Sequence, residues 1–179
     1  MQDERSLVSR AQKRDPEAFA QLYEQYFDKI YRYVALKIGD QWEAEDLTQQ
    51  VFLNAFQSIG SYKQRGSPFA SWLFRIAHNQ VVDYLRKRKV RELPLEEART
   101  ATGVNPVQLA EQRLRVEQLW TACEKLSELQ REVISLRFAG GLSIAEVART
   151  MGKSEGAVKA LQHAALLRLR KVLSPEETN

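Results

Sequence analysis

The side chains that could do chemistry gather in two stretches, residues 61–89 and 142–171. The first stretch opens with a polar loop, continues with aromatic residues and ends in four successive cations. The second carries lysine, glutamine, histidine and arginine side chains on a segment of helical spacing. Groups of these types hydrogen-bond to base edges and to phosphates. The chain shows no nucleophile–base pair, phosphate-cradling loop or metal cluster, so we expect nucleic-acid binding without catalysis and without a cofactor.

The most constrained pattern is a helix-turn-helix at residues 142–162, which read LSIAEVARTMGKSEGAVKALQ. Ala148 supplies a small side chain where two helices would cross. Gly152 suits a turn with positive φ, because it has no Cβ to clash there. Val158 and Leu161 would bury the inner face of the second helix. A plain helical hairpin uses the same small residue and glycine, but the capped first helix and the polar outer face favour DNA binding.

In a helix-turn-helix the second helix enters the major groove and presents its first turns to base edges. Glu155 could accept a hydrogen bond from cytosine or could stay solvated. The residues expected to meet duplex DNA are Ser154, Glu155, Lys159, Gln162, His163 and Arg168.

Helices must position both stretches, because apolar residues recur at spacings of three and four and nothing at residues 16–89 alternates with period two. Proline after a capping residue, as in Asp15-Pro16, predicts a helix start. We expect helices from residue 16, at 42–59 and from 68 to 89. A helix from 106 to about 126 and three shorter ones follow, two of them opened by capping boxes, at Ser127 and Ser143.

The resulting prediction is an all-α chain of two small helical domains joined by a flexible linker. Residues 1–89 would form the first domain, residues 90–105 the linker and residues 106–179 the helix-turn-helix domain. The linker VRELPLEEARTATGVN contains Pro, Gly and charges without periodicity.

The composition is that of a globular protein, with 44% apolar and 28% charged residues among 179. No apolar run reaches the roughly 18 residues of a membrane span, and the polar N-terminus lacks a signal-peptide core. One cysteine excludes an internal disulfide, and two distant histidines do not form a metal site. We therefore expect a cytoplasmic protein that is not inserted in a membrane, and its net charge of +4 suggests an anionic partner.

Four blocks resemble the extracytoplasmic-function sigma factors of bacterial RNA polymerase, in family order and over nearly the whole chain outside the linker. The blocks are AFAQLYEQYFDKIYRYV, AEDLTQQVFLNAF, RGSPFASWLFRIAHNQVVDYLR and LSELQREVISLRFAGGLSIAEVARTMGKSEGAVKALQHAALLRLRK. The resemblance implies a factor that binds core polymerase and directs promoter recognition, promoter opening and transcription initiation. It also implies that the first domain binds and melts the −10 element and that the second reads the −35 element.

The same resemblance implies which residues contact the unpaired −10 strand and which dock on polymerase. The strand contacts would be Tyr62, Lys63, Gln64, Arg65, Ser71, Arg75, Asn79 and Arg86. The contacts with the clamp coiled coil would be Asp46, Leu47, Gln49 and Gln50. Further implied partners are the polymerase flap and an anti-sigma factor, for which the apolar run at residues 164–167 offers a surface. The acidic linker would run near the active-site and RNA-exit channels.

Some residues in the first stretch have a simpler role. Trp72 has the spacing of a core residue, and His78 and Asp83 are expected to be structural or solvated. An exposed Tyr62 would serve as a stacking platform for a base, which is worth roughly 1–3 kcal/mol.

Two other classes of protein remain as alternatives. A helix-turn-helix regulator that dimerises through its first domain would bind half-sites about one helical turn apart without polymerase. An enzyme acting on nucleic acid would depend on an acidic residue, so neutral replacement of each candidate acid would test it.

Overall fold

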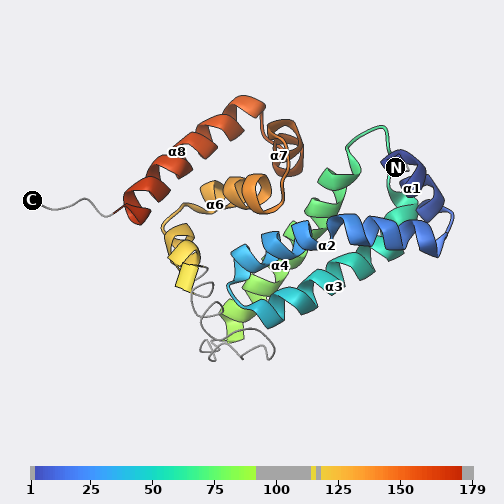
Figure 1. The fold of residues 1–179 in the computed structure, drawn as a ribbon, viewed down its shortest axis with the longest axis horizontal. Helices are drawn as coiled ribbons and strands as arrows, with labels where there is room; N and C mark the ends of the chain where they lie inside the picture. The colour runs from blue at the N-terminus through green and yellow to red at the C-terminus, as the bar shows by residue number, and fades with distance from the viewer. Residues whose placement is uncertain (1–2, 92–113, 116–117, 175–179) are drawn as a thin grey trace, which may run out of the picture.

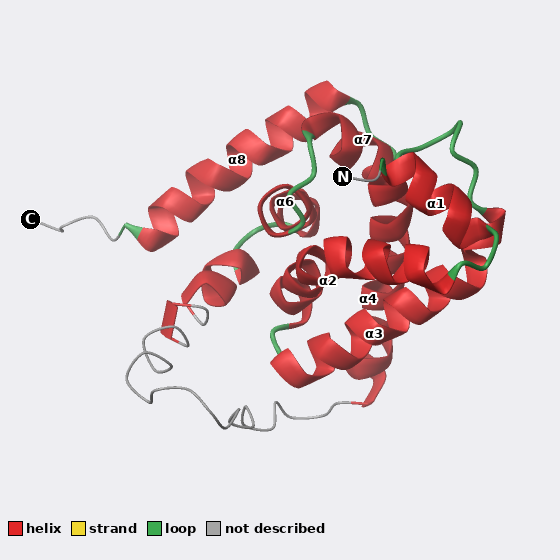
Figure 2. Ribbon diagram, turned by 45° about the vertical axis from the view of Figure 1, so that its right-hand side comes forward, coloured by secondary structure: helices red, strands yellow, loops and turns green. Residues whose placement is uncertain are grey.

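The computed structural model describes residues 3–91, 114–115 and 118–174. All regular structure in these residues is helical, and no strand occurs among them (Figures 1 and 2). The all-α prediction is therefore confirmed. The predicted linker lies outside the described residues except for positions 90 and 91, which extend the last helix of the first domain.

The first half is a four-helix unit in which α2 contacts every other helix. Its elements are α1 (Glu4–Gln12), α2 (Pro16–Ile38), α3 (Gln41–Ser58), the 3-10 turn η1 (Ile59–Ser61) and α4 (Phe69–Arg91).

Side-chain caps decide where the long helices begin. The Asp15 carboxylate accepts from two backbone N–H groups of the first turn of α2, with Pro16 at the first helical position, as predicted. The Asp40 carboxylate caps α3 by the same kind of hydrogen bond, so that the helix begins at Gln41, one residue before the predicted start. Helix α1 was not predicted, although Leu7, Val8 and Ala11 bury one face of it completely. Nine residues with three apolar positions are too short a pattern to stand out in a sequence.

The second half also consists of short helices, and α6 lies between α8 and α2 (Figure 1). Residues 118–124 are helical, and the later elements are α6 (Glu128–Ile134), the π-helical turn η2 (Ser135–Ala139), α7 (Ile144–Met151) and α8 (Glu155–Leu173).

The predicted capping boxes and turn of this half are confirmed, whereas the helix start predicted at residue 106 lies outside the described residues. Ser127 and Ser143 each form a complete capping box, with Gln130 and Glu146 as the reciprocal partners. Gly152 ends α7 at φ 64°, the left-handed conformation that the turn of a helix-turn-helix requires.

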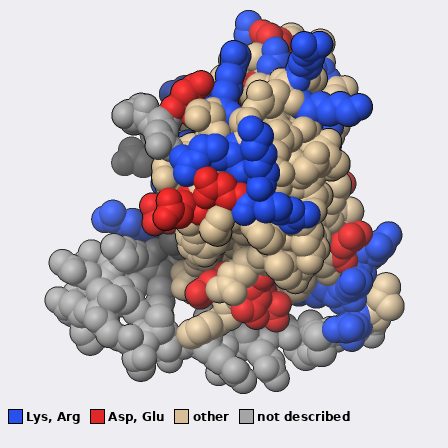
Figure 3. Space-filling view, turned by 90° about the vertical axis from the view of Figure 1, so that its right-hand side faces the viewer, with Lys and Arg blue, Asp and Glu red and all other residues tan. Residues whose placement is uncertain are grey.

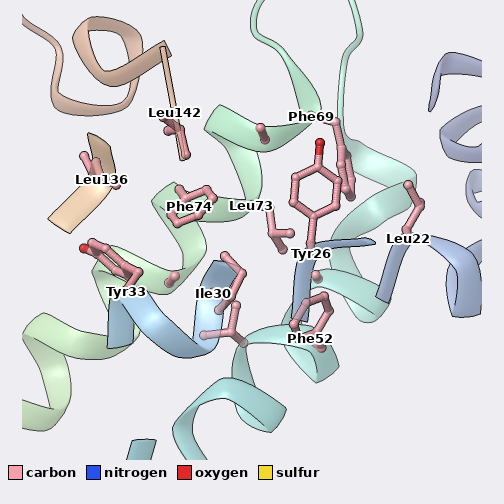
Figure 4. Packing of buried hydrophobic residues seen from close by; sticks show 14 of the residues in the cluster. Leu22, Tyr26, Ile30, Tyr33, Phe52, Phe69, Leu73, Phe74, Leu136 and Leu142 are labelled. Carbon is pink, nitrogen blue, oxygen red and sulfur yellow. The ribbon is translucent and has the colours of Figure 1, made fainter. Parts of the chain in front are cut away.

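The two halves share one hydrophobic core. Leu136 and Leu142 from the second half pack into the same cluster as Tyr33 and Phe74 from the first, and all four are buried (Figure 4). A smaller cluster of the second half, around Ala122, Cys123, Leu126, Ile134, Ala165 and Leu169, lies beside it. In this structure the predicted domains are therefore not independent bodies.

Gly140 marks a close approach between the halves. A Cβ at this position would lie 2.8 Å from the Leu136 carbonyl oxygen and 2.8 Å from the Phe74 ring on α4. The absence of a side chain at Gly140 thus lets the turn after η2 seat directly on the ring.

We expect Gly140→Ala to lower the free energy of unfolding by about 1–3 kcal/mol, because the added methyl overpacks this contact. Urea denaturation would measure the change. Gly156→Ala is the matched control, since a Cβ there meets nothing within 4 Å and alanine favours helix α8. Equal midpoints for Gly140→Ala and the unchanged chain would show that the halves do not depend on this close approach.

Candidate nucleic-acid interface

A buried carboxylate from the second half joins the two halves. Glu132 on α6 accepts a hydrogen bond from the Tyr33 hydroxyl at 2.7 Å and forms an ion pair with Lys37. The Nδ1 atom of His78 on α4 lies 3.0 Å from the same carboxylate. The Glu132 side chain is only 6% exposed and that of Lys37 only 7%, so the ion pair is shielded from water.

Three partners keep this carboxylate charged. Burial alone would raise the pKa of Glu132, but the hydrogen bond with His78 and the Lys37 ammonium outweigh it and lower the pKa to about 2. Because the pKa lies below its ordinary value of 4.5, the carboxylate stabilises the packed form above about pH 4.5. This stabilisation is lost as the pH falls toward 2.

The packed second half covers part of the predicted strand-binding surface of α4. Ser71 is completely buried, and its hydroxyl donates to the Glu146 carbonyl of α7 at 3.4 Å. The Arg75 guanidinium donates to the Arg149 carbonyl at 3.2 Å. Ser71 is therefore covered by α7, whereas Arg75 stays exposed and has one guanidinium nitrogen engaged by this helix.

The loop before α4 keeps its charged side chains in solvent but buries its aromatic one. Lys63, Gln64 and Arg65 are exposed. Tyr62 is 7% exposed and packs against Phe69, while its hydroxyl donates to the Ser67 carbonyl at 2.5 Å. The expectation of an exposed Tyr62 stacking platform is therefore wrong, because the ring completes the core beneath the loop.

Trp72 is half-buried and packs against Tyr62 and Phe69, with ring centroids 5.2 and 5.5 Å away. Its predicted core role is confirmed.

The loop borders a polar cavity of about 390 Å³. The Ser67 hydroxyl, which lines it, is buried without a hydrogen-bond partner. The other lining residues are Glu4, Arg5, Val8, Tyr62, Gln64, Arg65, Gly66, Pro68, Phe69 and Arg149. Figure 3, which faces the side of the molecule that carries α1, shows many Lys and Arg side chains with acidic ones among them.

The other predicted strand contacts lie further along α4. Asn79 and Arg86 are exposed, and the Arg86 guanidinium is paired with Asp83 at 3.0 Å. His78 was expected to be structural or solvated, and its contact with Glu132 makes it structural in this arrangement.

Helix α8 presents most of its predicted base and phosphate contacts to solvent. The exposed residues are Ser154, Glu155, Lys159, His163 and Arg168. The Ser154 hydroxyl caps the helix by accepting from the Ala157 N–H at 3.1 Å. Gln162 is half-buried, and its side-chain oxygen accepts from Arg137 Nε at 3.0 Å, which leaves one oxygen lone pair and both amide hydrogens for a ligand.

The predicted polymerase-docking residues lie together on α3. Asp46, Gln49 and Gln50 are exposed and Leu47 is half-buried. The side chain of Gln50 donates to Asn54 one turn later. The four residues thus form a polar face with one apolar side chain, which can contact another protein.

The part of the chain that the structure describes contains neither a metal-site cluster nor a membrane-spanning helix. No group of three or more His, Cys, Asp or Glu residues there could hold a metal ion. None of the described helices is both long and apolar enough to cross a bilayer.

Sequence reasoning missed two residues that organise this interface. Gln12 on α1 donates to the Ile59 and Tyr62 carbonyls at 3.1 and 2.7 Å, and so holds the start of the loop. Glu132 falls within the helix predicted after the Ser127 capping box, and no role was expected for it. A charged residue on an otherwise apolar face was the available signal, but nothing local identifies partners 54 to 99 positions away.

Each half of the chain matches the model of a known protein family. Residues 22–91 match the model of Sigma-70 region 2, and residues 122–171 match that of Sigma-70, region 4. The ECF RNA polymerase sigma factor BldN of Streptomyces coelicolor is 41% identical over 170 residues, which cover 93% of this chain and 64% of that protein. SigX of Bacillus subtilis is 32% identical, with 87% of this chain and 83% of SigX covered.

Solved structures show the same arrangement of helices. CnrH, solved in complex with the cytosolic domain of CnrY, matches with a TM-score of 0.77 at 23% identity, over 97% of this chain and 99% of CnrH. The sigma factor RpoE of Bartonella quintana, solved with the anti-sigma factor NepR, matches with a TM-score of 0.68 at 25% identity, over 89% and 98% of the two chains. The chain therefore belongs to the ECF sigma factors of RNA polymerase, which are transcription initiation factors and not enzymes.

Proposed function

We propose that the two halves divide promoter recognition between an unpaired strand and a duplex. The first half, residues 1–89, would bind the −10 element through the loop at 61–68 and the polar face of α4. The second half, residues 106–179, would read the −35 element with α8. The observation that carries this assignment is the exposed outer face of α8. This helix follows the capped helix α7 and a turn in which Gly152 is left-handed, as a recognition helix does in a helix-turn-helix.

Core RNA polymerase would supply the catalysis and would hold the factor through α3, with Asp46 and Gln49 exposed on its outer face. This dependence on a partner separates the proposal from a dimeric regulator. A regulator of that kind would use the aromatic residues of the first half as a dimer interface. Those rings instead pack within one chain, as Tyr23 does against Phe27 and Phe52.

An anti-sigma factor is a further proposed partner. RpoE of Bartonella quintana is held by one, NepR, in the solved complex. Here the predicted surface at residues 164–167 includes Leu166 and Leu167, which are 41% and 48% exposed. We place the protein in the cytoplasm, where it would meet polymerase and DNA.

The packed arrangement has to open before promoter melting. Ser71 cannot contact a strand while α7 buries it, and the Arg75 guanidinium is partly engaged by the Arg149 carbonyl of the same helix. Opening requires Glu132 to leave Tyr33 and Lys37, so this buried ion pair sets part of the energy of opening.

Lys159→Ala is expected to change which −35 sequences the protein selects with core polymerase, because the exposed ammonium faces the groove in the first turns of α8. Selection from a randomised −35 pool would measure it. Arg168→Ala is the matched control, since loss of a phosphate contact weakens all sequences about equally. An unchanged selection by the Lys159 variant would contradict the recognition-helix assignment.

Asp46→Arg is expected to reduce capture of core polymerase at least tenfold, because it reverses a charge in the centre of the proposed docking face. A pull-down with purified core polymerase would measure it. Asp28→Arg makes the same change on the exposed surface of α2 and should leave capture unaltered. Full retention of the Asp46 variant would refute docking through α3.

Glu132→Ala is expected to open the free chain, because it leaves the Lys37 ammonium buried without a partner, which costs about 3–5 kcal/mol. Small-angle scattering should show a larger radius of gyration, and circular dichroism should show unchanged helicity. Glu128→Ala removes an exposed carboxylate from the same helix and serves as the control. If both variants stay as compact as the unchanged chain, Glu132 does not hold the halves together.

A further inference from the structure

Helix α1 lies beside the loop that we propose captures the unpaired strand, although residues 1–15 carried no expected function. Leu7, Val8 and Ala11 anchor the helix in the core, with at most 1% of each exposed. Glu4 lies one turn before Val8 on the same side of the helix, and both line the cavity of about 390 Å³ together with Arg5. The helix is therefore rigidly placed at the edge of this cavity.

Side-chain hydrogen bonds connect α1 to the loop at both ends. The Gln12 amide donates to the Tyr62 carbonyl at 2.7 Å. The Gln64 amide donates to the Arg5 carbonyl at 3.2 Å. Neither of these two hydrogen bonds uses the Arg5 guanidinium. The loop and the helix thus form one continuous wall of the cavity, and the Arg5 guanidinium is not used to hold them together.

The chemistry of this wall suits a nucleobase edge. Glu4 presents a carboxylate, one oxygen of which accepts from the Tyr26 hydroxyl, and Arg5 presents guanidinium donors. Ser67 also contributes to the lining, although its hydroxyl oxygen is buried and has no hydrogen-bond partner. A cavity of about 390 Å³ lies in the size range of small-molecule sites, about 300–1,000 Å³.

We propose that α1 forms one wall of the pocket that takes an extruded promoter base, and that Arg5 contacts the edge of this base directly. The inference rests on the proposed role of the loop in holding the −10 strand. Extruded bases are read by hydrogen bonds to their edges within such a pocket. Arg149 of the second half lines the same cavity in the packed form, so separation of the halves would open the site on that side.

The test pairs a protein variant with single abasic sites in the DNA. Complexes of core polymerase with the full chain would be titrated with a fork-junction promoter, either intact or with one unpaired −10 base removed. One abasic position should weaken binding by the unchanged chain about tenfold. Arg5→Ala should weaken binding to intact DNA by the same factor and should show no further loss at that position, because the two changes remove one interaction.

Lys13→Ala is the matched control, since Lys13 is an exposed cation just after α1 that does not line the cavity. It should leave the abasic penalty unchanged. If Arg5→Ala weakens intact and abasic DNA equally, or behaves like Lys13→Ala, Arg5 does not contact a base and the inference fails. If no abasic position affects the unchanged chain, the role of the loop itself fails, and this result is visible without any variant.

Discussion

The arrangement of the whole molecule depends on one buried carboxylate, that of Glu132. A lone charge in a protein interior is unfavourable, so the second half can bury this residue only where the first half supplies donors. Tyr33, Lys37 and His78 supply them from two helices, and each pairs with the same side chain. The carboxylate therefore fixes where α6 sits, and the apolar contact between Gly140 and Phe74 then follows from that placement. Apolar packing alone would allow several registers, whereas this set of partners allows one.

The same surface of α4 serves two incompatible purposes. In the packed form, Ser71 and Arg75 donate to backbone carbonyls of α7, and these are the residues assigned to the unpaired strand. Under the proposed function, promoter DNA and the second half would compete for one face of the first half. Competition of this kind would make the free factor a poor DNA binder and would link strand binding to the separation of the halves, with polymerase and promoter offering the alternative contacts.

The loop before α4 combines a fixed interior with a charged exterior. Tyr62 packs into the aromatic cluster beneath it, and Gln12 holds the backbone where the loop begins, so that this part of the loop has little conformational freedom. Lys63 and Arg65 stay in solvent. A site ordered in advance loses less entropy when it binds a flexible single strand, which is an advantage for a step that must also separate base pairs.

Local chemistry in the sequence determined the helices, their caps and the helix-turn-helix, because Asp15, the two capping boxes and Gly152 act on neighbouring backbone groups. The family and the exposed face of α8 could also be predicted, because both depend on local sequence blocks and helical spacing. Only the tertiary structure decided that Tyr62 is buried, that α1 walls the cavity and that Glu132 joins the halves. These outcomes depend on contacts between residues tens of positions apart, and a periodic pattern records which face of a helix is buried but not what covers it.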